Sequence, residues 1–583
     1  MLVTIGAGES TRASFAEEAD VIEFVTMLER FERGELCPED WRGFRVTRGV
    51  YAQRQPGDAQ MLRVRVPQGV LTKGQLEALA DVAERYARGV GQLTTRQNVQ
   101  FHFVRLRDVE PAMRRLAEAG LTTRDTGGSA IRNITTCPYA GVAADEVFDV
   151  TPYAEALTRY FLRHPLSALL PRKFKIAFEG CAGDHVALAI NDLGFKALYV
   201  NGGRGFRVTV GGGTATLPTA ARVIHECLPA SDVLRVAESV VRVYHRLGDY
   251  HHKRRNRLKF LIRALGWTFW EEEYGRELAA CRLYNTAPVL EINPPTSESG
   301  PASTGQTTPV PEIGADAFER WRRMSVRPQQ QSGRVMVIVT LPVGELTADQ
   351  MRVAGTLARA HGDGTVRLTP EQNLLFQWID STGVRQLHDQ LIDAMLEPGE
   401  AGTIADITSC PGAELCRLGI TRTRGLARLL HECLRARPDL IAAAEGARIK
   451  ISGCPNGCGH HHIATIGFQG SVRRCETHTV PQYFVMVGGD ITGQSPSFAR
   501  LAAKIPARRI PDAVQRLVAL YTEERRHDES APSFFARVDI NRVKCTLAPL
   551  ARLSAGDATL TDFIDLGDDR EFTQDEKEGE CSS

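Results

Sequence analysis

Residues 334–379 read RVMVIVTLPVGELTADQMRVAGTLARAHGDGTVRLTPEQNLLFQWI, and this stretch decides the fold because it occurs twice. The first copy, residues 61–104, begins MLRVRVPQG, continues LTKGQLEALADVAERYARG and ends LTTRQNVQFHFV. In both copies, alternating patterns flank a segment with helical period, which predicts strand, helix and strand in α+β order. The pairs LT and QN at residues 93–98 return at residues 368–373 with a constant offset of 275.

A second block repeats further along the chain. KFKIAFEG at residues 173–180 matches RIKISG at residues 448–453, and the Gly-Phe pairs that follow them agree in spacing to within two residues. Two successive blocks in register indicate a tandem duplication. The predicted fold class is therefore α+β, with two duplicated halves related by pseudo-twofold symmetry and a cleft between them that suits a cofactor.

Four cysteines in the second half have the spacing of metal ligands. Cys410 and Cys416 enclose five residues in TSCPGAELC, Cys454 and Cys458 enclose three in SGCPNGCGHHH, and 37 residues separate the pairs. Zinc favours two-residue gaps, whereas a cubane iron–sulfur cluster takes four cysteines and accepts unequal gaps. The spacing favours an iron–sulfur cluster. Glycines let backbone N–H groups turn toward cluster sulfurs, and the glycines that fit this role are Gly412, Gly453, Gly457 and Gly459.

The motif C-x5-C followed by G-C-P-N-x-C resembles the sirohaem and iron–sulfur family of assimilatory sulfite and nitrite reductases. The resemblance implies a [4Fe-4S] cluster on the four cysteines and a sirohaem beside it, both in the cleft between the halves. In that family the last cysteine, here Cys458, binds an iron of the cluster and also the sirohaem iron through one bridging sulfur. Cluster and haem would then be electronically coupled.

The resemblance and the duplication together predict six divisions of the chain. A polar, proline-rich passage without hydrophobic period reads as a linker between the halves. The predicted divisions are an N-terminal arm with the first ferredoxin-like half-domain (1–130), a sirohaem-binding domain with anion-binding cations (131–290), the linker (291–333), the second ferredoxin-like half-domain (334–400), the domain with the cluster cysteines (401–550) and an acidic tail (551–583).

The first half supplies cations at short intervals. A sirohaem carries many carboxylates and its substrate is another anion, so both need fixed positive charge. By the resemblance, the cations that bind the substrate are Arg63, Arg132, Lys173 and Lys175. Those implied to bind the macrocycle, besides Cys458, are Arg96, Gln100, His102, Arg172, Arg257 and Lys259.

Plainer interpretations exist for several of these residues. Two lysines two residues apart on a strand point to one face, which suits a shared anion but also a solvated surface. The run KRRNRLKFLIR, which contains Arg257 and Lys259, is also typical of a solvated helix face or a domain contact. Residues 460–462, three successive histidines, read as surface or core residues. Cys137 and Cys181 lie near the loops equivalent to the cluster loops, without partners, and read as core residues.

Composition limits the location and the partners of the protein. The chain has 583 residues, 43% hydrophobic and 24% charged residues, a net charge of +1 and 13 cysteines. These values predict a cytoplasmic protein of two or three domains with no nucleic-acid or membrane partner. No G-x-G-x-x-G turn suggests a nicotinamide or flavin domain, so electrons would come from a ferredoxin or a separate flavoprotein.

The C-terminal region carries two further expectations. The acidic tail predicts a segment that is disordered or lies on the surface, with Cys581 as a free thiol without an evident partner. A basic face for an acidic electron donor would lie elsewhere, for example at Arg422, Arg424 and Arg428.

The main functional prediction is the six-electron reduction of sulfite to sulfide. Reduction of nitrite to ammonium on the same cofactors is the alternative, and the two branches share most motifs. By the resemblance, the nitrite branch commonly places asparagine where this chain has Lys175, and a second lysine suits doubly charged sulfite better. An alternative of another class is a non-catalytic scaffold stabilised by zinc or a cluster, which gives no reason for the cations of the first half.

Overall fold

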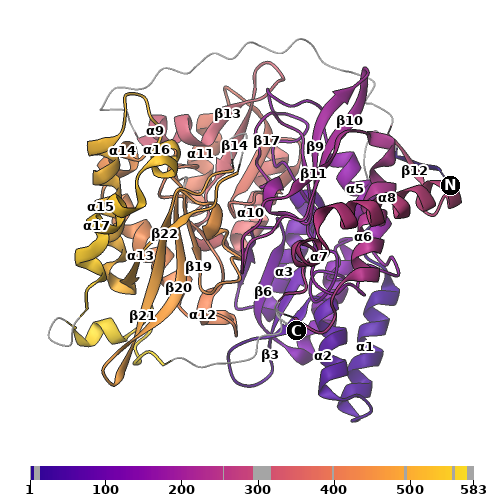
Figure 1. Cartoon of the computed structure of the whole chain (residues 1–583), viewed down its shortest axis with the longest axis horizontal. Helices are drawn as coiled ribbons and strands as arrows, with labels where there is room; N and C mark the ends of the chain where they lie inside the picture. Colours follow the sequence, from indigo (N-terminus) through magenta and orange to yellow (C-terminus); the bar gives the residue numbers. More distant parts are fainter. Residues whose placement is uncertain are drawn as a thin grey trace.

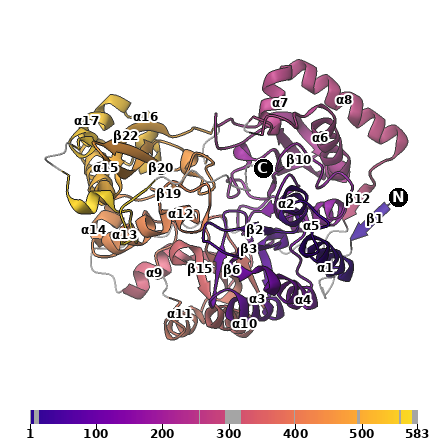
Figure 2. The ribbon, with the colours of Figure 1, turned by 90° about the horizontal axis from the view of Figure 1, so that it is seen from below.

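The computed structural model describes residues 2–5, 14–253, 255–292, 317–396, 399–491, 496–553 and 558–573. The first half of the chain, indigo to magenta, and the second half, orange to yellow, form two lobes that meet in the middle of the molecule (Figure 1). The view from below shows the same two lobes (Figure 2). Residues far apart in the sequence therefore meet along this boundary.

The predicted strand–helix–strand unit is present twice. Both central helices begin with a capping box, formed by Thr72 with Gln75 and by Thr347 with Gln350, which satisfies N–H groups of the first turn. The first unit consists of β3 (Ala59–Val64), α3 (Lys73–Tyr86), β5 (Val90–Leu93), β6 (Val99–Arg105) and α4 (Val109–Glu118). The second consists of β14 (Arg334–Val339), α10 (Ala348–His361), β16 (Thr365–Leu368), β17 (Leu374–Asp380) and α11 (Val384–Asp393).

Each of these two half-domain sheets contains one short strand from the other half. β4 (Val70–Thr72) pairs antiparallel with β16, and β15 (Glu345–Thr347) pairs antiparallel with β5. The strand orders are β13-β14-β17-β16-β4 and β15-β5-β6-β3-β2, where β13 is Val326–Pro328 and β2 is Val50–Ala52. A strand that left its sheet would leave N–H and C=O groups unpaired, so the exchange ties the halves together.

Two buried glutamines repeat this exchange with their side chains. Gln97 Nε2 donates to the carbonyl of Leu368 at 3.0 Å, and Gln372 Nε2 donates to the carbonyl of Leu93 at 2.7 Å. The oxygen of each amide accepts a backbone N–H from its own half. The reciprocal bonds confirm the predicted pseudo-twofold symmetry.

Each half also contains an outer five-stranded sheet of the same design, with three parallel strands followed by two antiparallel ones. The first is β7 (Thr135–Thr136), β8 (Ile176–Glu179), β9 (Leu193–Val200), β10 (Gly203–Val210) and β11 (Arg222–Pro229). The second is β18 (Thr408–Ser409), β19 (Ile449–Ser452), β20 (Ile466–Cys475), β21 (His478–Val487) and β22 (Arg500–Pro506). Each parallel strand of the second sheet begins 273 residues after its counterpart, so the duplication includes this domain too.

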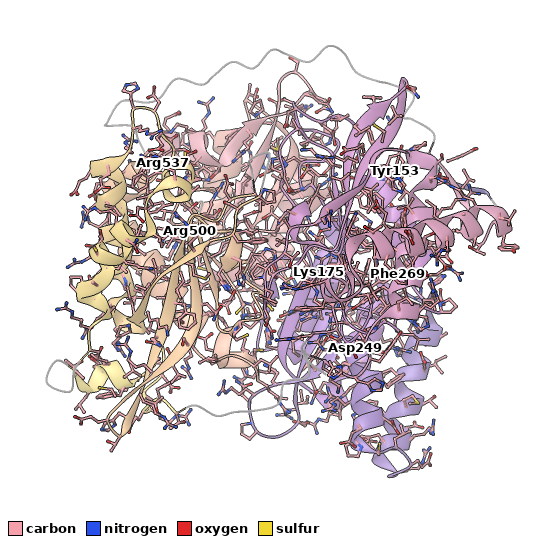
Figure 3. The ribbon with its side chains drawn as sticks, viewed as in Figure 1. Tyr153, Lys175, Asp249, Phe269, Arg500 and Arg537 are labelled. Carbon is pink, nitrogen blue, oxygen red and sulfur yellow. The ribbon has the colours of Figure 1, made fainter. Side chains whose placement is uncertain are left out.

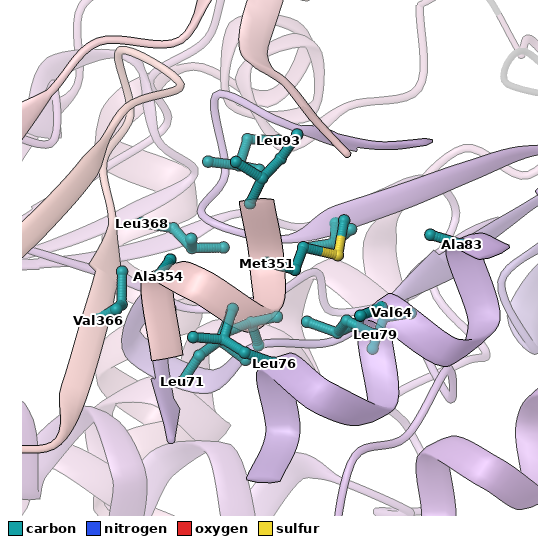
Figure 4. Close-up of a cluster of buried hydrophobic side chains, with 14 of the residues drawn as sticks. Val64, Leu71, Leu76, Leu79, Ala83, Leu93, Met351, Ala354, Val366 and Leu368 are labelled. Atoms are coloured by element: carbon teal, nitrogen blue, oxygen red, sulfur yellow. The ribbon is translucent and has the colours of Figure 1, made fainter. Parts of the chain in front are cut away.

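Apolar side chains form one core shared by the two half-domains and one core under each outer sheet. In the shared core, α3 packs against α10, and Leu76 and Leu79 face Met351 and Ala354 (Figure 4). The outer cores contain the buried faces of α5 (Thr151–Phe161) and α6 (Val233–Leu247) in the first half, and of α13 (Thr423–Arg435) and α15 (Ile510–Glu524) in the second.

The other described elements surround these sheets. None of the described helices is both long and apolar enough to cross a lipid bilayer. The predicted cytoplasmic location stays a prediction. The elements that surround the sheets are α1 (Glu18–Glu32), α2 (Pro38–Thr47), α7 (Leu258–Leu265), α8 (Trp267–Tyr284), α12 (Gly412–Leu415), α14 (Pro438–Ala443), α16 (Ala531–Arg537) and α17 (Ile540–Ala551), and the parallel pair β1 (Leu2–Ile5) and β12 (Val289–Ile292).

Part of the predicted linker is structured. α9 (Ala317–Ser325) and β13 fall within the range 291–333, and β13 pairs with β14. Trp321 on α9 is buried in the shared core. Residues 317–328 of the predicted linker are therefore structured, since Trp321 and the partly buried Phe318 pack α9 on the shared core. The division of the chain at 291–333 stays a prediction. Residues 293–316 lie outside the described part of the chain.

Residues 558–573 of the acidic tail pack on the second half. Asp565 is buried and accepts the backbone N–H of Arg422 at 2.8 Å, and the Arg422 guanidinium pairs with Asp568 at 2.8 Å. Leu566 belongs to the core of the second half. This part of the tail is therefore fixed at the surface of the domain that carries the cluster cysteines. Cys581 lies outside the described residues.

Candidate active site

A cleft between the halves brings most of the predicted site residues together. It encloses about 1350 Å³, counting the part that is open to solvent. Lys175 lies at the boundary between the lobes (Figure 3). The predicted residues that line the cleft are Arg63, Arg96, Gln100, His102, Arg132, Lys173, Lys175, Arg257, Cys410, Cys416 and Cys458.

The four cysteines of the second half lie close together beside the cleft, and Cys410, Cys416 and Cys458 line it. Cys410 follows β18, Cys416 follows α12, and Cys454 and Cys458 follow β19. Burial raises the pKa of the Cys454 thiol well above its usual value, and negative charge on the other three sulfurs raises it further. Thiols that suppress one another's ionisation in this way are stabilised as thiolates by a bound metal. The donor set therefore fits an iron–sulfur cluster.

Backbone geometry supports this role for two of the predicted glycines. Gly453 N–H donates to Cys410 Sγ at 3.2 Å. Burial raises the pKa of Cys410 to about 11, which this N–H and that of Gly412 oppose. Gly412 has φ +62°, and a Cβ there would lie 2.5 Å from Thr423 Oγ1. Both positions therefore need glycine for a close approach of backbone to sulfur.

The two arginines predicted to bind substrate lie next to each other. Arg63 Nη1 and Arg132 Nη1 both donate to the carbonyl of Thr126, at 2.9 and 2.8 Å. Gln100 accepts from Arg63 Nη2 at 2.7 Å and from Nε at 2.9 Å when its amide oxygen faces the guanidinium. Thr126 was not predicted, and a carbonyl acceptor leaves no signal in sequence. One carbonyl thus fixes two guanidinium groups at the cleft.

The two lysines enter the cleft beside these arginines. Burial, together with the nearby Arg172, Arg132 and Arg257, lowers the pKa of Lys173 to about 8, although Cys458 opposes this shift. Burial and neighbouring cations also lower the pKa of Lys175 well below its usual value.

Among the described residues, no carboxylate forms an ion pair with Arg63, Arg132, Lys173 or Lys175. A group of cations without acidic partners is stabilised by bound anions. The electrostatics therefore fit a polycarboxylate cofactor and an anionic substrate.

Arg96 and His102 are held by polar groups of the protein. Arg96 donates to Asn191 Oδ1 at 3.0 Å and to the carbonyls of Asn133 and Ile176 at 2.7 and 3.0 Å. Its buried Nε has no partner in the described part of the chain. Burial, with Arg424 and Arg63 nearby, lowers the pKa of His102 to about 3, so the imidazole is neutral. Both residues are prearranged, and Arg96 keeps one N–H available.

Arg257 lines the cleft and is held there by the carboxylate of Asp192, which the sequence did not indicate. Arg257 Nη2 pairs with Asp192 Oδ2 at 2.7 Å, and the same oxygen accepts the backbone N–H of Lys175 at 2.9 Å. Asp192 is fully buried. Asp192 therefore positions Arg257, which was predicted to bind the cofactor, and the segment of Lys175, which was predicted to bind the substrate. A lone aspartate in NDLGF gives no such signal in sequence.

Arg172 and Lys259 do not line the cleft. Lys259 Nζ donates to the carbonyls of Gly213, Thr214, Thr216 and Leu217 at 2.7–3.3 Å. It therefore shapes the loop that brings Thr214 to the cleft. Arg172 is buried next to Lys173. Their predicted contacts with the macrocycle stay predictions.

The three successive histidines of the second half lie in the interior of the protein. His460, His461 and His462 are all buried, and burial lowers the pKa of each. They are neutral residues of the interior, which is the core interpretation of the two that the sequence allowed.

Arg424 and Arg428 both pair with Glu345. Together with the pairing of Arg422 to the tail, these contacts mean that the three arginines do not form an unpaired basic face.

Cys137 and Cys181 are buried, as predicted, but they do not lack partners. Their sulfur atoms lie 3.4 Å apart, and His185 Nδ1 lies 3.4 Å from Cys137 Sγ. The prediction of unpartnered core cysteines is wrong in this respect, because residues 179–185 bring other polar groups to the same place.

The chain is a duplicated α+β protein whose central cleft joins convergent thiols to a group of cations without acidic partners. This combination defines the class of iron–sulfur oxidoreductases that act on small anions. Comparison with known families agrees. The family described as "Nitrite and sulphite reductase 4Fe-4S domain" matches residues 127–280 and 400–547, and "Nitrite/Sulfite reductase ferredoxin-like half domain" matches residues 51–119 and 327–394. The chain belongs to the nitrite and sulfite reductase family, whose cofactors are sirohaem and a [4Fe-4S] cluster.

Several characterised proteins are similar over most of the chain. The ferredoxin–nitrite reductase of Synechococcus elongatus is 30% identical over 469 residues, which cover 79% of this chain and 85% of the relative. That of Leptolyngbya laminosa is 31% identical, over 81% of this chain and 89% of the relative. The solved structure of Mycobacterium tuberculosis NirA protein aligns with a TM-score of 0.74 at 26% identity, covering 90% of this chain and 97% of that one.

Proposed function

We propose that the protein reduces nitrite to ammonium with electrons from a ferredoxin. The observation that carries the proposal is that four cations without acidic partners line one cleft together with three of the four mutually close thiols. Nitrite comes first because the similar proteins above are named ferredoxin–nitrite reductases. The sequence alone favoured sulfite, and these relatives support nitrite better.

Residues of both halves would hold the cofactors. Cys410, Cys416, Cys454 and Cys458 would hold the cluster, and the unpartnered N–H of Arg96 would donate to a carboxylate of the macrocycle. When bound, the coupled cofactors supply an iron that binds the substrate and electrons one at a time. Gln100 and His102, which line the same wall, would fix the macrocycle by hydrogen bonds.

The cations would then act on the substrate oxygens. Arg63 and Arg132 are fixed by the Thr126 carbonyl, so they can bind an oxyanion with little loss of side-chain freedom. Lys173 has a pKa of about 8, and a group that titrates near neutral pH is an effective proton donor to an oxygen that leaves as water. The four cations therefore bind the anion and assist its deoxygenation.

Sulfite reduction is the second candidate, because Lys175 lines the cleft. A second ammonium group near Lys173 stabilises a doubly charged anion more than a singly charged one. Steady-state turnover of the holoprotein with reduced ferredoxin, measured with nitrite and with sulfite, tests the choice. We expect the larger kcat/KM with nitrite; a larger value with sulfite would replace the proposal by the second candidate.

The non-catalytic scaffold makes a separate prediction. Replacement of Lys173 and Lys175 by alanine should leave cluster and sirohaem absorption unchanged but remove most turnover, because neither lysine belongs to the thiol set. A scaffold would tolerate the change without loss. Retained turnover of both anions would refute the roles that we propose for these lysines.

A further inference from the structure

The first half has its own group of metal-binding side chains at the place that corresponds to the cluster of the second half. β7, β8 and β9 begin 273 residues before β18, β19 and β20. At this offset the counterpart of Cys410 is Cys137, that of Cys454 is Cys181, and that of Cys458 is His185. The counterpart of Cys416 is Ala143, and Glu179 at the end of β8 lies beside the three others. We call Cys137, Glu179, Cys181 and His185 the first-half thiol group.

The ligand atoms of this group have the separations of a tetrahedral metal site. One atom from each of the four side chains lies within 4.8 Å of all the others. The distance is 3.4 Å from Cys137 Sγ to Cys181 Sγ, 3.4 Å from Cys137 Sγ to His185 Nδ1, and 3.4 Å from His185 Nδ1 to Glu179 Oε1. Ligands of a tetrahedral zinc site lie about 3.3–3.8 Å apart when their bonds are about 2.0–2.3 Å long.

Burial makes a bound cation favourable here. Cys137, Cys181 and Glu179 are fully buried in the interior of the first outer domain. Glu179 accepts the backbone N–H groups of Cys181 at 2.9 Å and His185 at 2.6 Å, which fixes both carboxylate oxygens. A buried carboxylate next to two thiols is costly unless positive charge neutralises it.

The acid–base state of the group agrees with this geometry. Burial raises the pKa of Cys137 well above its usual value, while hydrogen bonds from Cys137 and His185 lower that of Cys181. Burial lowers the pKa of His185, but Cys181 and Glu179 outweigh it and raise the value to about 10. A metal ion binds such a group with its thiols and imidazole deprotonated, so binding would release the protons that they carry.

We propose that the first-half thiol group binds a single divalent transition-metal ion, with Zn²⁺ as the best fit. Two thiolates, one imidazole and one carboxylate are ligands that zinc accepts in a closed tetrahedral site. A cubane cluster needs four cysteines, and Ala143 stands where the fourth would be. A disulfide would bring the two sulfurs to about 2.05 Å, but Glu179 and His185 would then lose their role.

An entry path for the ion exists. His185 lines a second cavity between the halves, which encloses about 1130 Å³ counting the part open to solvent. The imidazole is the part of the group nearest to this cavity, since the two thiols are fully buried. Tyr139 packs its ring edgewise on His185, with 4.8 Å between centroids, and so holds the imidazole plane. An ion that enters from the cavity would meet an oriented nitrogen first.

Metal analysis of the holoprotein tests the proposal. The protein is purified with both cofactors, without chelators and without a polyhistidine tag, and zinc and iron are measured by inductively coupled plasma mass spectrometry. We expect about one zinc ion per chain beside the iron of the cofactors. Cys181→Ser and His185→Ala should each lower zinc to background and leave iron and sirohaem absorption unchanged. Cys281→Ser is the matched control, because Cys281 is a buried cysteine on α8 of the same domain, outside the group.

X-ray absorption at the zinc edge reads the ligands without interference from iron. We expect two sulfur atoms at about 2.3 Å and two nitrogen or oxygen atoms at about 2.0–2.1 Å. Three results would overturn the proposal: no zinc after incubation with one equivalent of Zn²⁺ and desalting, zinc that persists in both variants, or a Cys137–Cys181 disulfide found by peptide mass spectrometry. None of these measurements depends on which anion the enzyme reduces.

Discussion

Replacement of Lys175 by asparagine should change the preference between sulfite and nitrite. Lys175 lies two residues after Lys173, and both line the cleft with Arg63 and Arg132. Its backbone N–H is fixed by Asp192, so the substitution changes the charge at a constant position. Asparagine keeps a polar side chain there and removes one positive charge.

The size of the effect follows from the surroundings of the side chain. Two unit charges about 4 Å apart interact by about 4 kcal/mol at an effective dielectric constant of about 20. Lys175 is half-buried and faces a cleft that is open to solvent, so screening reduces this to about 1.4 kcal/mol per unit of substrate charge, which is about tenfold in rate. Fully ionised sulfite carries one more negative charge than nitrite. We therefore expect kcat/KM to fall about tenfold for nitrite and about a hundredfold for sulfite.

The assay is turnover of both anions with one electron donor, at fixed pH and ionic strength. Lys175→Arg, which keeps the charge, should retain the original ratio of the two kcat/KM values. Lys450→Asn is a matched control, because Lys450 is the counterpart of Lys175 at the offset of 275 and lines the second cavity. A ratio that stays unchanged in Lys175→Asn, or that shifts equally in Lys450→Asn, would refute the electrostatic reasoning.

Three further changes test other parts of the structure. Gly412→Ala should lower cluster content, measured as iron and acid-labile sulfide, because its Cβ would meet Thr423; Gly34→Ala, which has open space at a similar φ, should not. Substrate binding should be strongest well below pH 8 and weaken as the pH rises through about 8, because Lys173, whose pKa is about 8, loses its charge there. In Lys173→Arg, whose side chain stays charged, the rise of KM with pH should therefore shift to higher pH. Gln97→Leu should lower the free energy of unfolding in urea by about 1–3 kcal/mol, because it leaves the buried N–H of Thr136 without a partner; an unchanged midpoint would contradict the role of the glutamine pair.

The repeated half-domain could be predicted because its signals are local. Periodicity and the LT…QN repeat are properties of short segments, and both capping boxes lie within them. The exchange of β4 and β15 between the halves could not be predicted, since each strand has three residues and pairs with a partner more than 250 residues away. Register between distant strands is set by packing, which periodicity does not encode.

The candidate site likewise contains residues that the sequence could predict and residues that it could not. Cysteine spacing and the basic motifs identify residues that line one cleft, because the residue type alone shows that these side chains can bind metals or anions. Asp192 and the Thr126 carbonyl were missed because their importance comes only from the groups that they fix. Lys259 has the expected charge, but four carbonyl oxygens take its ammonium group. The charge of a residue therefore predicts the sign of the local electrostatic potential better than it predicts which group the side chain contacts.

The duplication also explains why only one of the two equivalent cavities is suited to anions. In the second cavity, Lys450 lies 3.9 Å from Glu371, and Arg448 lies 4.0 Å from Asp406. Glu371 stands where the first half has Arg96. Two cations of the second cavity, Arg448 and Lys450, are thus paired with acids of their own half, whereas Lys173 and Lys175 have no such partner among the described residues.

The exchanged strands hold this charged first-half surface against the cysteines of the second half. Thr95 Oγ1 donates to the carbonyl of Cys458 at 2.9 Å across the same boundary. Among the described residues, neither half alone has both the four cluster cysteines and the cations without acidic partners. Two copies of one fold therefore make an asymmetric site because the roles are divided between them. The first copy has cations without acidic partners and lacks the four cluster cysteines, whereas the second has the four cysteines and pairs Arg448 and Lys450 with acids.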